Sequence, residues 1–355
     1  MRAALREAAK GAGRTSPNPA VGAVIVARGG RSVLARGYHR QAGMPHAERE
    51  ALRALGGKAA RGATLYVTLE PCSTCGRTPP CVDAIIEAGF ARVVIGDIDP
   101  NPAHAGRGIR LLRDAGISVL TGVLEEKCHA LNPAFNKWIQ TGMPLVIAKA
   151  GMSLDGRLSR PPGEGQWITG PASRERAHRL RAEVDAILIG AGTLRADNPR
   201  LTVRRVPNAR QPWRVVLSRG GEELPAGSHL FTDEFKDRTL VYVRKSLRKV
   251  LRDLGRKGVT SVLIEGGMQV LGEAFDRRLV DRVHFFMAPL FLGGPKIVLG
   301  GRGAGSTPES ARIIHPRYEK IGGDLHLWGE VAFAETPVQA ARPALGAKFR
   351  PLAGS

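Results

Sequence analysis

The feature that most constrains the fold of this chain is a set of three candidate metal ligands, His46, Cys72 and Cys81. A glutamate, Glu48, lies two residues after the first of them. One imidazole and two thiolates supply three of the four ligands of a tetrahedral zinc ion, and a catalytic zinc site keeps the fourth position open. Because residues i and i+2 lie on different sides of a helix, His46 and Glu48 can converge only at a helix start. The helix-forming run 47–55 predicts such a start.

This combination supplies the parts of a hydrolytic deaminase. A His-x-Glu segment followed by Pro-Cys is the pattern of zinc deaminases. Bound zinc lowers the pKa of water to about 7, which makes a nucleophile available near neutral pH. We predict that Glu48 takes the proton of that water, protonates the ring nitrogen of a pyrimidine and then delivers a proton to the departing ammonia.

The choice of cysteine ligands follows from local structure. Cys72 and Cys75 form a C-x-x-C pair, which could also be redox-active, and His46 alone could cap a helix. Cys75 precedes a proline-containing stretch that cannot be helical, whereas Cys81 opens a predicted helix directly after two prolines. A helix N-terminus lowers the pKa of a thiol and favours the metal-binding thiolate. We therefore predict Cys72 and Cys81 as the ligands. Cys128, which stands apart in sequence, is predicted to be a packed or surface thiol on a helix.

Length, charge and cysteine usage restrict the class of protein. A chain of 355 residues predicts two domains. No apolar run approaches the roughly 18 residues of a membrane span, and residues 1–10 lack the apolar core of a secretory signal. We therefore expect no membrane association, a cytoplasmic location and thiols that bind metal. The net charge of +21 would suit nucleic acid, but aromatic residues are only 5% and the arginines are scattered, which favours phosphorylated small molecules.

Strands and helices alternate along the chain, which predicts an α/β fold. In the first half we expect strands at 20–28, 33–39, 64–69, 92–96 and 117–120, and helices at 1–10, 47–55, 81–88 and 107–115. The alternation is interrupted near residues 141–144, which indicates a domain boundary, and it then starts again. It then gives strands at 145–149, 186–189, 214–217, 240–243, 261–265 and 282–287, and helices at 173–181, 246–255 and 269–275. We predict domains at 1–143 and 144–333, and a disordered tail at 334–355.

A glycine turn in the second half is a candidate cofactor site. Glu265-Gly266-Gly267-Met268-Gln269 follows an apolar strand and opens a helix, where backbone N–H groups can approach a phosphate. Such a turn also occurs for purely geometric reasons. The segment 190–195 also follows a strand but lacks the third glycine of a Rossmann fingerprint and an acidic residue at the expected distance. We therefore exclude a standard Rossmann site.

Several longer motifs resemble one known family. The first half contains T-S-P-N-P-A-V-G at 15–22, G-Y-H at 37–39, P-H-A-E at 45–48, T-L-E-P-C-S at 68–73, G-R-T-P-P-C at 76–81 and D-P-N-P at 99–102. The second half contains K-A-G-M-S-L-D-G at 149–156, Q-W-I-T at 166–169, L-R-A at 180–182, G-A-G-T-L-R-A-D-N-P-R-L-T-V-R at 190–204 and E-G-G at 265–267. From about residue 5 to 328 the chain resembles the bifunctional riboflavin-biosynthesis deaminase–reductase family. The long insert between the two cysteines is characteristic of that family and supports Cys81 over Cys75.

The resemblance implies a cytidine-deaminase-like domain followed by a dihydrofolate-reductase-like domain. It implies zinc-dependent deamination of a phosphoribosylaminopyrimidine and NADPH-dependent reduction of its ribosyl chain, in a protein that we expect to be a homo-oligomer. In the deaminase, the matched substrate residues are Asn18, His39, Ser73 and Arg77. In the reductase, the matched NADPH residues are Gly151, Trp167, Thr193, Asp197, Ser218, Gly267, Met268, Gln269, Val270, Leu271, Gly272 and Glu273. The matched reductase substrate residues are Arg181, Leu201, Arg204 and Glu265, with Lys149 as the candidate that polarises the sugar carbon.

Departures from the family pattern define the alternatives. Thr74 stands where histidine is usual, Gly165 where serine is common and Leu217 where aspartate is frequent, and Met268-Gln269 replaces a small residue and threonine. These departures allow a reductase-only protein with a degenerate deaminase. The positive charge and the shared zinc motif allow a nucleic-acid deaminase of the tRNA type with an accessory domain. Stacking aromatics, which such an enzyme needs, are few in the first half.

Overall fold

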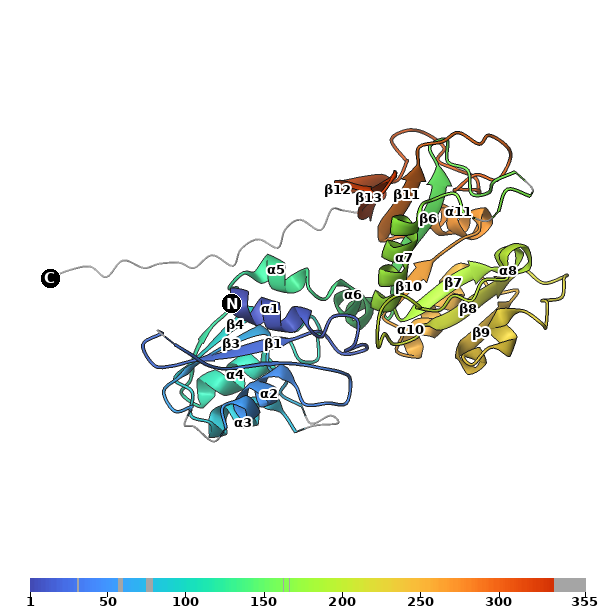
Figure 1. Ribbon diagram of the computed structural model, residues 1–355. Coiled ribbons are helices and arrows are strands. Elements are labelled where there is room, and N and C mark those ends of the chain that lie inside the picture. Colours follow the sequence, from blue (N-terminus) through green and yellow to red (C-terminus); the bar gives the residue numbers. More distant parts are fainter. Residues whose placement is uncertain (31, 57–59, 75–78, 162, 166, 335–355) are drawn as a thin grey trace.

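The computed structural model describes residues 1–30, 32–56, 60–74, 79–161, 163–165 and 167–334. Within these residues the chain forms two separate sheets, one of five strands and one of eight, each with helices packed on its faces (Figure 1). This arrangement confirms the predicted α/β class. The predicted tail lies outside the described residues except for its first position. No helix in the described part of the chain is long and apolar enough to span a membrane.

The five-stranded sheet has the order β2-β1-β3-β4-β5. Its strands are β1 (Gly22–Val26), β2 (Val33–Tyr38), β3 (Thr64–Leu69), β4 (Arg92–Asp97) and β5 (Ser118–Leu120). The strands β2, β1 and β3 pair antiparallel, whereas β3, β4 and β5 pair parallel. Its helices are α1 (Arg2–Ala9), α2 (Ala47–Ala54), α3 (Cys81–Glu87), α4 (Arg107–Asp114), α5 (Glu125–His129) and α6 (Pro133–Thr141). One face carries α1 and α5, and the other carries α2, α3 and α4 (Figure 1).

The eight-stranded sheet has the order β12-β13-β11-β6-β10-β7-β8-β9. Its strands are β6 (Leu145–Ser153), β7 (Ala186–Gly190), β8 (Trp213–Ser218), β9 (Thr239–Val243), β10 (Ser261–Ile264), β11 (Arg282–Ala288), β12 (Arg312–Ile321) and β13 (Asp324–Ala332). The strands from β11 to β9 are all parallel. Its helices are α7 (Pro171–Glu183), α8 (Ala191–Asp197), α9 (His229–Thr232), α10 (Leu247–Arg256) and α11 (Met268–Asp276), with a 3-10 turn at Lys236–Arg238. Separate apolar clusters pack on the two faces of this sheet.

The hairpin β12–β13 and the helices α6, α8 and α9 were not among the predicted elements. Most positions of β12 are exposed, so its sequence lacks the apolar alternation that marks a strand. Pro316 interrupts it where the register shifts between Ile314 and Arg317, as expected for proline in an edge strand. The predicted helix over Cys128 is α5, and its thiol is packed beneath Gly96.

Hydrogen bonds join the two halves of the chain. The Ser16 hydroxyl donates to Asp185 at 2.7 Å. The indole N–H of Trp138 donates to the carbonyl of Gly255 at 2.8 Å, and the Lys137 ammonium contacts Asp281 at 2.5 Å. The helix α6 therefore belongs to the first half in sequence but makes polar contacts with the second.

Candidate active sites

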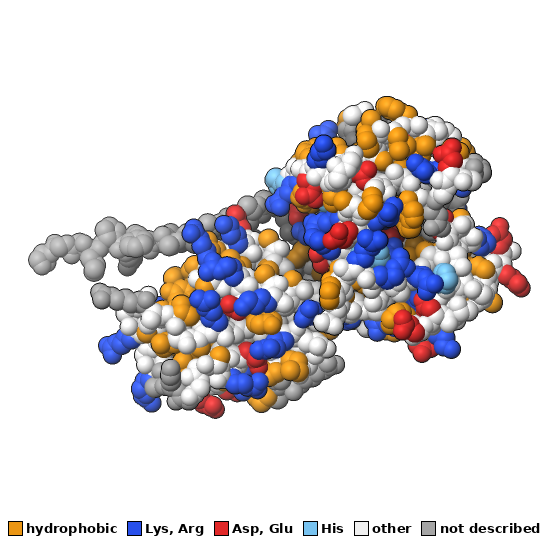
Figure 2. Space-filling model, viewed as in Figure 1, with side chains coloured by type: hydrophobic (Ala, Val, Ile, Leu, Met, Phe, Trp, Pro, Cys, Tyr) orange, Lys and Arg blue, Asp and Glu red, His pale blue; other side chains and the backbone are white. Residues whose placement is uncertain are grey.

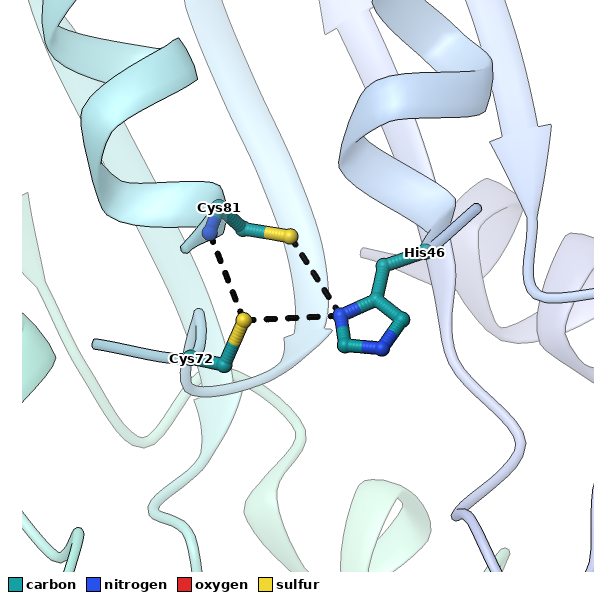
Figure 3. Close-up of side chains that lie close together, drawn as sticks. All are labelled: His46, Cys72 and Cys81. Atoms are coloured by element: carbon teal, nitrogen blue, oxygen red, sulfur yellow. Dashed lines mark hydrogen bonds between the residues drawn. The ribbon is translucent and has the colours of Figure 1, made fainter. Parts of the chain in front are cut away.

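The predicted metal ligands converge from three separate elements. His46 is the N-cap of α2, Cys72 follows β3 and Cys81 is the first residue of α3. The Nδ1 atom of His46 lies 3.4 Å from both sulfur atoms (Figure 3). The three ligand atoms all lie within 4.8 Å of one another, which is the geometry of a metal cluster.

The donor set fits a zinc ion. A hydrogen bond from the Cys81 thiol lowers the pKa of Cys72 to about 4 despite burial, with help from His46 and from the backbone N–H of Cys81 at 3.3 Å. The same contact and burial raise the pKa of Cys81. The two thiols therefore share a proton that a cation between them can replace, because metals bind the thiolate form.

Glu48 lies beside this cluster in the first turn of α2, as the predicted helix start at residue 47 requires. It is only 3% exposed. Burial raises the pKa of its carboxyl above the ordinary value, and the nearby Cys72 adds to the effect. A carboxyl with a raised pKa exchanges protons closer to neutral pH, which is what a general acid–base group needs. Close approach of α2 to β2 depends on Gly37, because a Cβ there would lie 2.5 Å from the carbonyl of Ala47.

Asn18 and His39 form a hydrogen-bonded pair next to the metal cluster. The His39 ring lies edge-on to His46, with centroids 5.2 Å apart. Its Nδ1 donates to the carbonyl of Pro45 at 3.1 Å, so in the neutral ring Nε2 accepts from the Asn18 amide at 3.2 Å. Burial lowers the pKa of His39 and favours this neutral form. The amide oxygen of Asn18 is thereby left to accept from a ligand.

The segment after Cys72 is only partly described. The Ser73 hydroxyl is buried and has no hydrogen-bond partner among the described residues. Thr74 is described and half-buried. Arg77, predicted to bind substrate, and Cys75 lie outside the described residues. An unpartnered buried hydroxyl is costly unless a ligand or water completes it.

Sequence reasoning missed Glu70, which orders the loop beside Cys72. This buried carboxylate accepts from the backbone N–H groups of Gly106 and Gly108, each at 2.9 Å, and from Asp99 at 3.3 Å. It thus ties the end of β3 to the start of α4. A carboxylate two residues before a ligand was the available signal.

The second half contains a cleft of about 1620 Å³. It opens where the parallel strands end, the usual position of a ligand site in such a sheet. Figure 2 shows Lys and Arg side chains gathered over this half of the molecule. Predicted residues that line the cleft are Lys149, Gly151, Trp167, Arg181, Thr193, Asp197, Leu201, Arg204, Ser218, Glu265, Gly267, Met268, Gln269, Val270, Leu271 and Glu273.

Gly272 is the predicted reductase residue that the cleft does not include. It lies in α11 facing the loop near residue 300, where a Cβ would lie 1.2 Å from the carbonyl of Gly300. Glycine is therefore required here for packing. Gly267 is the N-cap of α11 and lies close to the hydroxyl of Thr193, so both border the cleft.

A buried ion cluster forms the floor of the cleft. Glu265 accepts from two nitrogens of Arg181 at 2.6 and 2.8 Å and from the Lys149 ammonium at 3.4 Å. Burial alone would raise the pKa of Glu265, but the charges and hydrogen bonds of Arg181 and Lys149 lower it to about 2. The carboxylate, directly after β10, therefore stays ionised and holds Lys149 of β6 and Arg181 of α7 in place.

Comparisons with known proteins match both halves. Residues 144–327 match the family model "RibD C-terminal domain", and residues 1–97 match "Cytidine and deoxycytidylate deaminase zinc-binding region". The "Riboflavin biosynthesis protein RibD" of Aquifex aeolicus is 40% identical over 92% of this chain and 96% of its own length. That of Escherichia coli is 41% identical over 82% and 88%. This chain belongs to the RibD family.

Solved RibD structures agree with this assignment. Acinetobacter baumannii RibD has a TM-score of 0.85 at 35% identity and covers 94% of this chain and 98% of its own. A Thermotoga maritima diaminohydroxyphosphoribosylaminopyrimidine deaminase/5-amino-6-(5-phosphoribosylamino)uracil reductase has a TM-score of 0.82, also at 35% identity, covering 94% and 97%. The chain is thus a bifunctional enzyme of riboflavin biosynthesis that combines a zinc-binding deaminase with an NADPH-dependent reductase. The alternatives of a nucleic-acid deaminase and a reductase-only protein are not favoured.

Proposed function

We propose that residues 1–143 deaminate 2,5-diamino-6-(5-phosphoribosylamino)pyrimidin-4(3H)-one. Residues 144–333 then reduce the ribosyl chain of the resulting 5-amino-6-(5-phosphoribosylamino)uracil to a ribityl chain. The convergence of one imidazole, two thiols and a buried carboxyl carries the first half of this proposal. The cleft over the Lys149–Glu265–Arg181 cluster supports the second.

In the deaminase, His46, Cys72 and Cys81 would hold zinc, which when bound supplies a Lewis acid that activates water. Glu48 is placed to take a proton from that water and to return it to the pyrimidine ring and the departing amine. Its burial raises the pKa of the carboxyl, which makes both proton transfers accessible. Asn18, held by His39, would accept from a substrate N–H group.

In the reductase, the Nζ atom of Lys149 lies 3.4 Å from Glu265, its only ionic partner among the described residues. We propose that this ammonium polarises the sugar at the carbon being reduced, while bound NADPH supplies the two electrons and the hydrogen. Arg181 is fixed by Glu265 and by the carbonyl of Thr202 at 3.1 Å. Arg204, at the rim of the cleft, would bind the substrate phosphate.

Small molecules are the substrates of this enzyme family, and we propose that they are phosphorylated pyrimidines without a specific nucleic-acid partner. Arg204 and Arg205, which line the cleft and have no carboxylate partner among the described residues, support a phosphate ligand. We further propose a homo-oligomer that works in the cytoplasm, which agrees with the metabolic role of the family.

Mass spectrometry of products, with and without NADPH, tests this proposal on the full chain. With the diaminopyrimidine phosphate alone, we expect the deaminated product to accumulate; with NADPH, we expect the ribityl product. Glu48→Gln should lower deaminase turnover by about 100-fold or more and leave bound zinc and the reductase step unchanged. The matched control is Glu50→Gln in the same helix, since Glu50 lies outside the metal cluster and pairs with the exposed side chains of Arg40 and Arg53. Equal activity of Glu48→Gln and Glu50→Gln would contradict the assignment.

A further inference from the structure

The wall of the reductase cleft at residues 200–204 is held by side chains from other parts of the domain. This segment contains Leu201 and Arg204, both predicted to contact substrate. Three side chains fix its backbone. The Arg214 guanidinium donates to the carbonyl of Arg200 at 3.2 Å, and Arg181 donates to the carbonyl of Thr202 at 3.1 Å. The Gln211 amide accepts from the N–H of Val203 at 2.8 Å and donates to its carbonyl at 2.9 Å. The segment is therefore rigidly placed before any ligand binds.

A fourth contact comes from His178, which also faces the cleft. His178 lies in α7, is 7% exposed and lines the cleft. Its Nδ1 accepts from the backbone N–H of Arg204 at 3.5 Å. In a neutral ring the proton must then be on Nε2. Among the residues that the structure describes, Nε2 has no hydrogen-bond partner, so a donor is left available to a ligand.

The charges around His178 indicate what that ligand is. Arg181 is neutralised by Glu265 at the end of β10. Arg204 and Arg205 have no carboxylate partner within the described part of the chain. Burial and the charges of Arg181 and Arg204 lower the pKa of His178 to about 4, so the ring is a neutral donor beside two uncompensated cations. A phosphate monoester, with its double negative charge and several acceptor oxygens, complements this arrangement.

We propose that His178 donates its Nε2–H to the phosphate of the reductase substrate and acts with Arg204 as a specificity determinant for phosphorylated sugars. This inference rests on the proposed function, in which Arg204 binds that phosphate. His178 would bind the ligand directly and would also position Arg204 through its backbone N–H.

Two substitutions separate these contributions. In His178→Asn the side-chain oxygen can replace Nδ1 as acceptor for Arg204, but no donor reaches the position of Nε2. In His178→Gln the amide N–H can replace the Nε2 donor. Calorimetric titration of the full chain with ribose 5-phosphate, and with ribose as reference, measures the phosphate preference. Because a hydrogen bond to a charged group is worth tenfold or more in affinity, we expect about tenfold weaker ribose 5-phosphate binding in His178→Asn and less than about threefold in His178→Gln.

Two controls make the outcomes distinguishable. Arg179→Ala removes a charge from the same helix, where Arg179 pairs with Glu175 at the surface, and should leave binding unchanged. Arg204→Ala measures how much of the ribose 5-phosphate affinity depends on the phosphate-binding arginine of the cleft. If Arg204→Ala weakens binding but His178→Asn does not, or if His178→Gln is as weak as His178→Asn, the inference about His178 is wrong. If Arg204→Ala has no effect, or ribose 5-phosphate binds no better than ribose, the phosphate site of the proposed function is itself wrong.

Discussion

Replacing Glu265 by glutamine should destabilise the reductase half far more than an ordinary surface change. The carboxylate is buried and contacts Arg181 twice and Lys149 once. Lowering its pKa from the ordinary 4.5 to about 2 corresponds to about 3 kcal/mol in favour of the ionised form. A glutamine side chain resembles the protonated, neutral acid, so the variant loses this stabilisation of the folded state. The loss agrees with the roughly 3–5 kcal/mol that removal of one partner from a buried pair costs.

The pH dependence of this effect has a defined sign. A carboxyl whose pKa is lowered by folding contributes stability above its unfolded pKa, and that stability is lost as pH falls toward the folded value. The wild type should therefore lose the contribution of Glu265 between about pH 4.5 and pH 2. The difference between wild type and Glu265→Gln should be about 3 kcal/mol at pH 7 and about half of that at pH 3.

Hydrogen exchange measured by mass spectrometry is the suitable assay, because two domains need not unfold in one step. Opening free energies for peptides covering β10 and α7 report the environment of Glu265 directly. The matched control is Glu175→Gln in α7, an exposed carboxylate 2.6 Å from Arg179, which should change stability by less than about 0.5 kcal/mol. Equal effects of the two substitutions, or an effect of Glu265→Gln that grows as pH falls, would refute the reasoning.

Two further substitutions address the catalytic groups. Lys149→Met should lower reductase turnover by about 100-fold or more, and mass spectrometry should show that the deaminated intermediate accumulates. The control is Lys257→Met, which changes an exposed lysine. Normal turnover in Lys149→Met would contradict the proposed role of Lys149. Cys81→Ala should lose bound zinc in metal analysis, whereas Cys128→Ala, which removes a buried thiol remote from the cluster, should retain it. Full zinc occupancy in Cys81→Ala would require another ligand.

The metal cluster could be predicted because its members mark the ends of elements. Cys81 follows two prolines and begins α3, and His46 caps α2, so local sequence fixed where each side chain lies. The helix start also brought Glu48 onto the same side as His46. Each of these placements depends on residues near in sequence, so the sequence pattern alone indicates them.

Features that depend on distant contacts escaped prediction. The β12–β13 hairpin is an exposed edge whose polar sequence carries no strand pattern. Glu70 accepts hydrogen bonds from backbone N–H groups at the start of α4, 36 and 38 residues away; its position before Cys72 marked it, but not these partners. Gly272 was predicted to bind the cofactor because of its position in a motif. In the fold it packs against the carbonyl of Gly300, where a Cβ would clash, and this contact cannot be read from the sequence. The contact of His178 with the backbone N–H of Arg204 joins residues 26 positions apart, so no local pattern indicates it.

X-ray absorption at the zinc edge of the metal-replete full chain tests the central claim most directly. We predict one zinc ion per chain with two sulfur ligands at about 2.3 Å and nitrogen or oxygen ligands at about 2.0–2.1 Å. One nitrogen would come from His46, the sulfurs from Cys72 and Cys81, and the oxygen from solvent at the open position. A shell of three or four sulfurs, or protein that binds no zinc when the metal is supplied, would contradict this account.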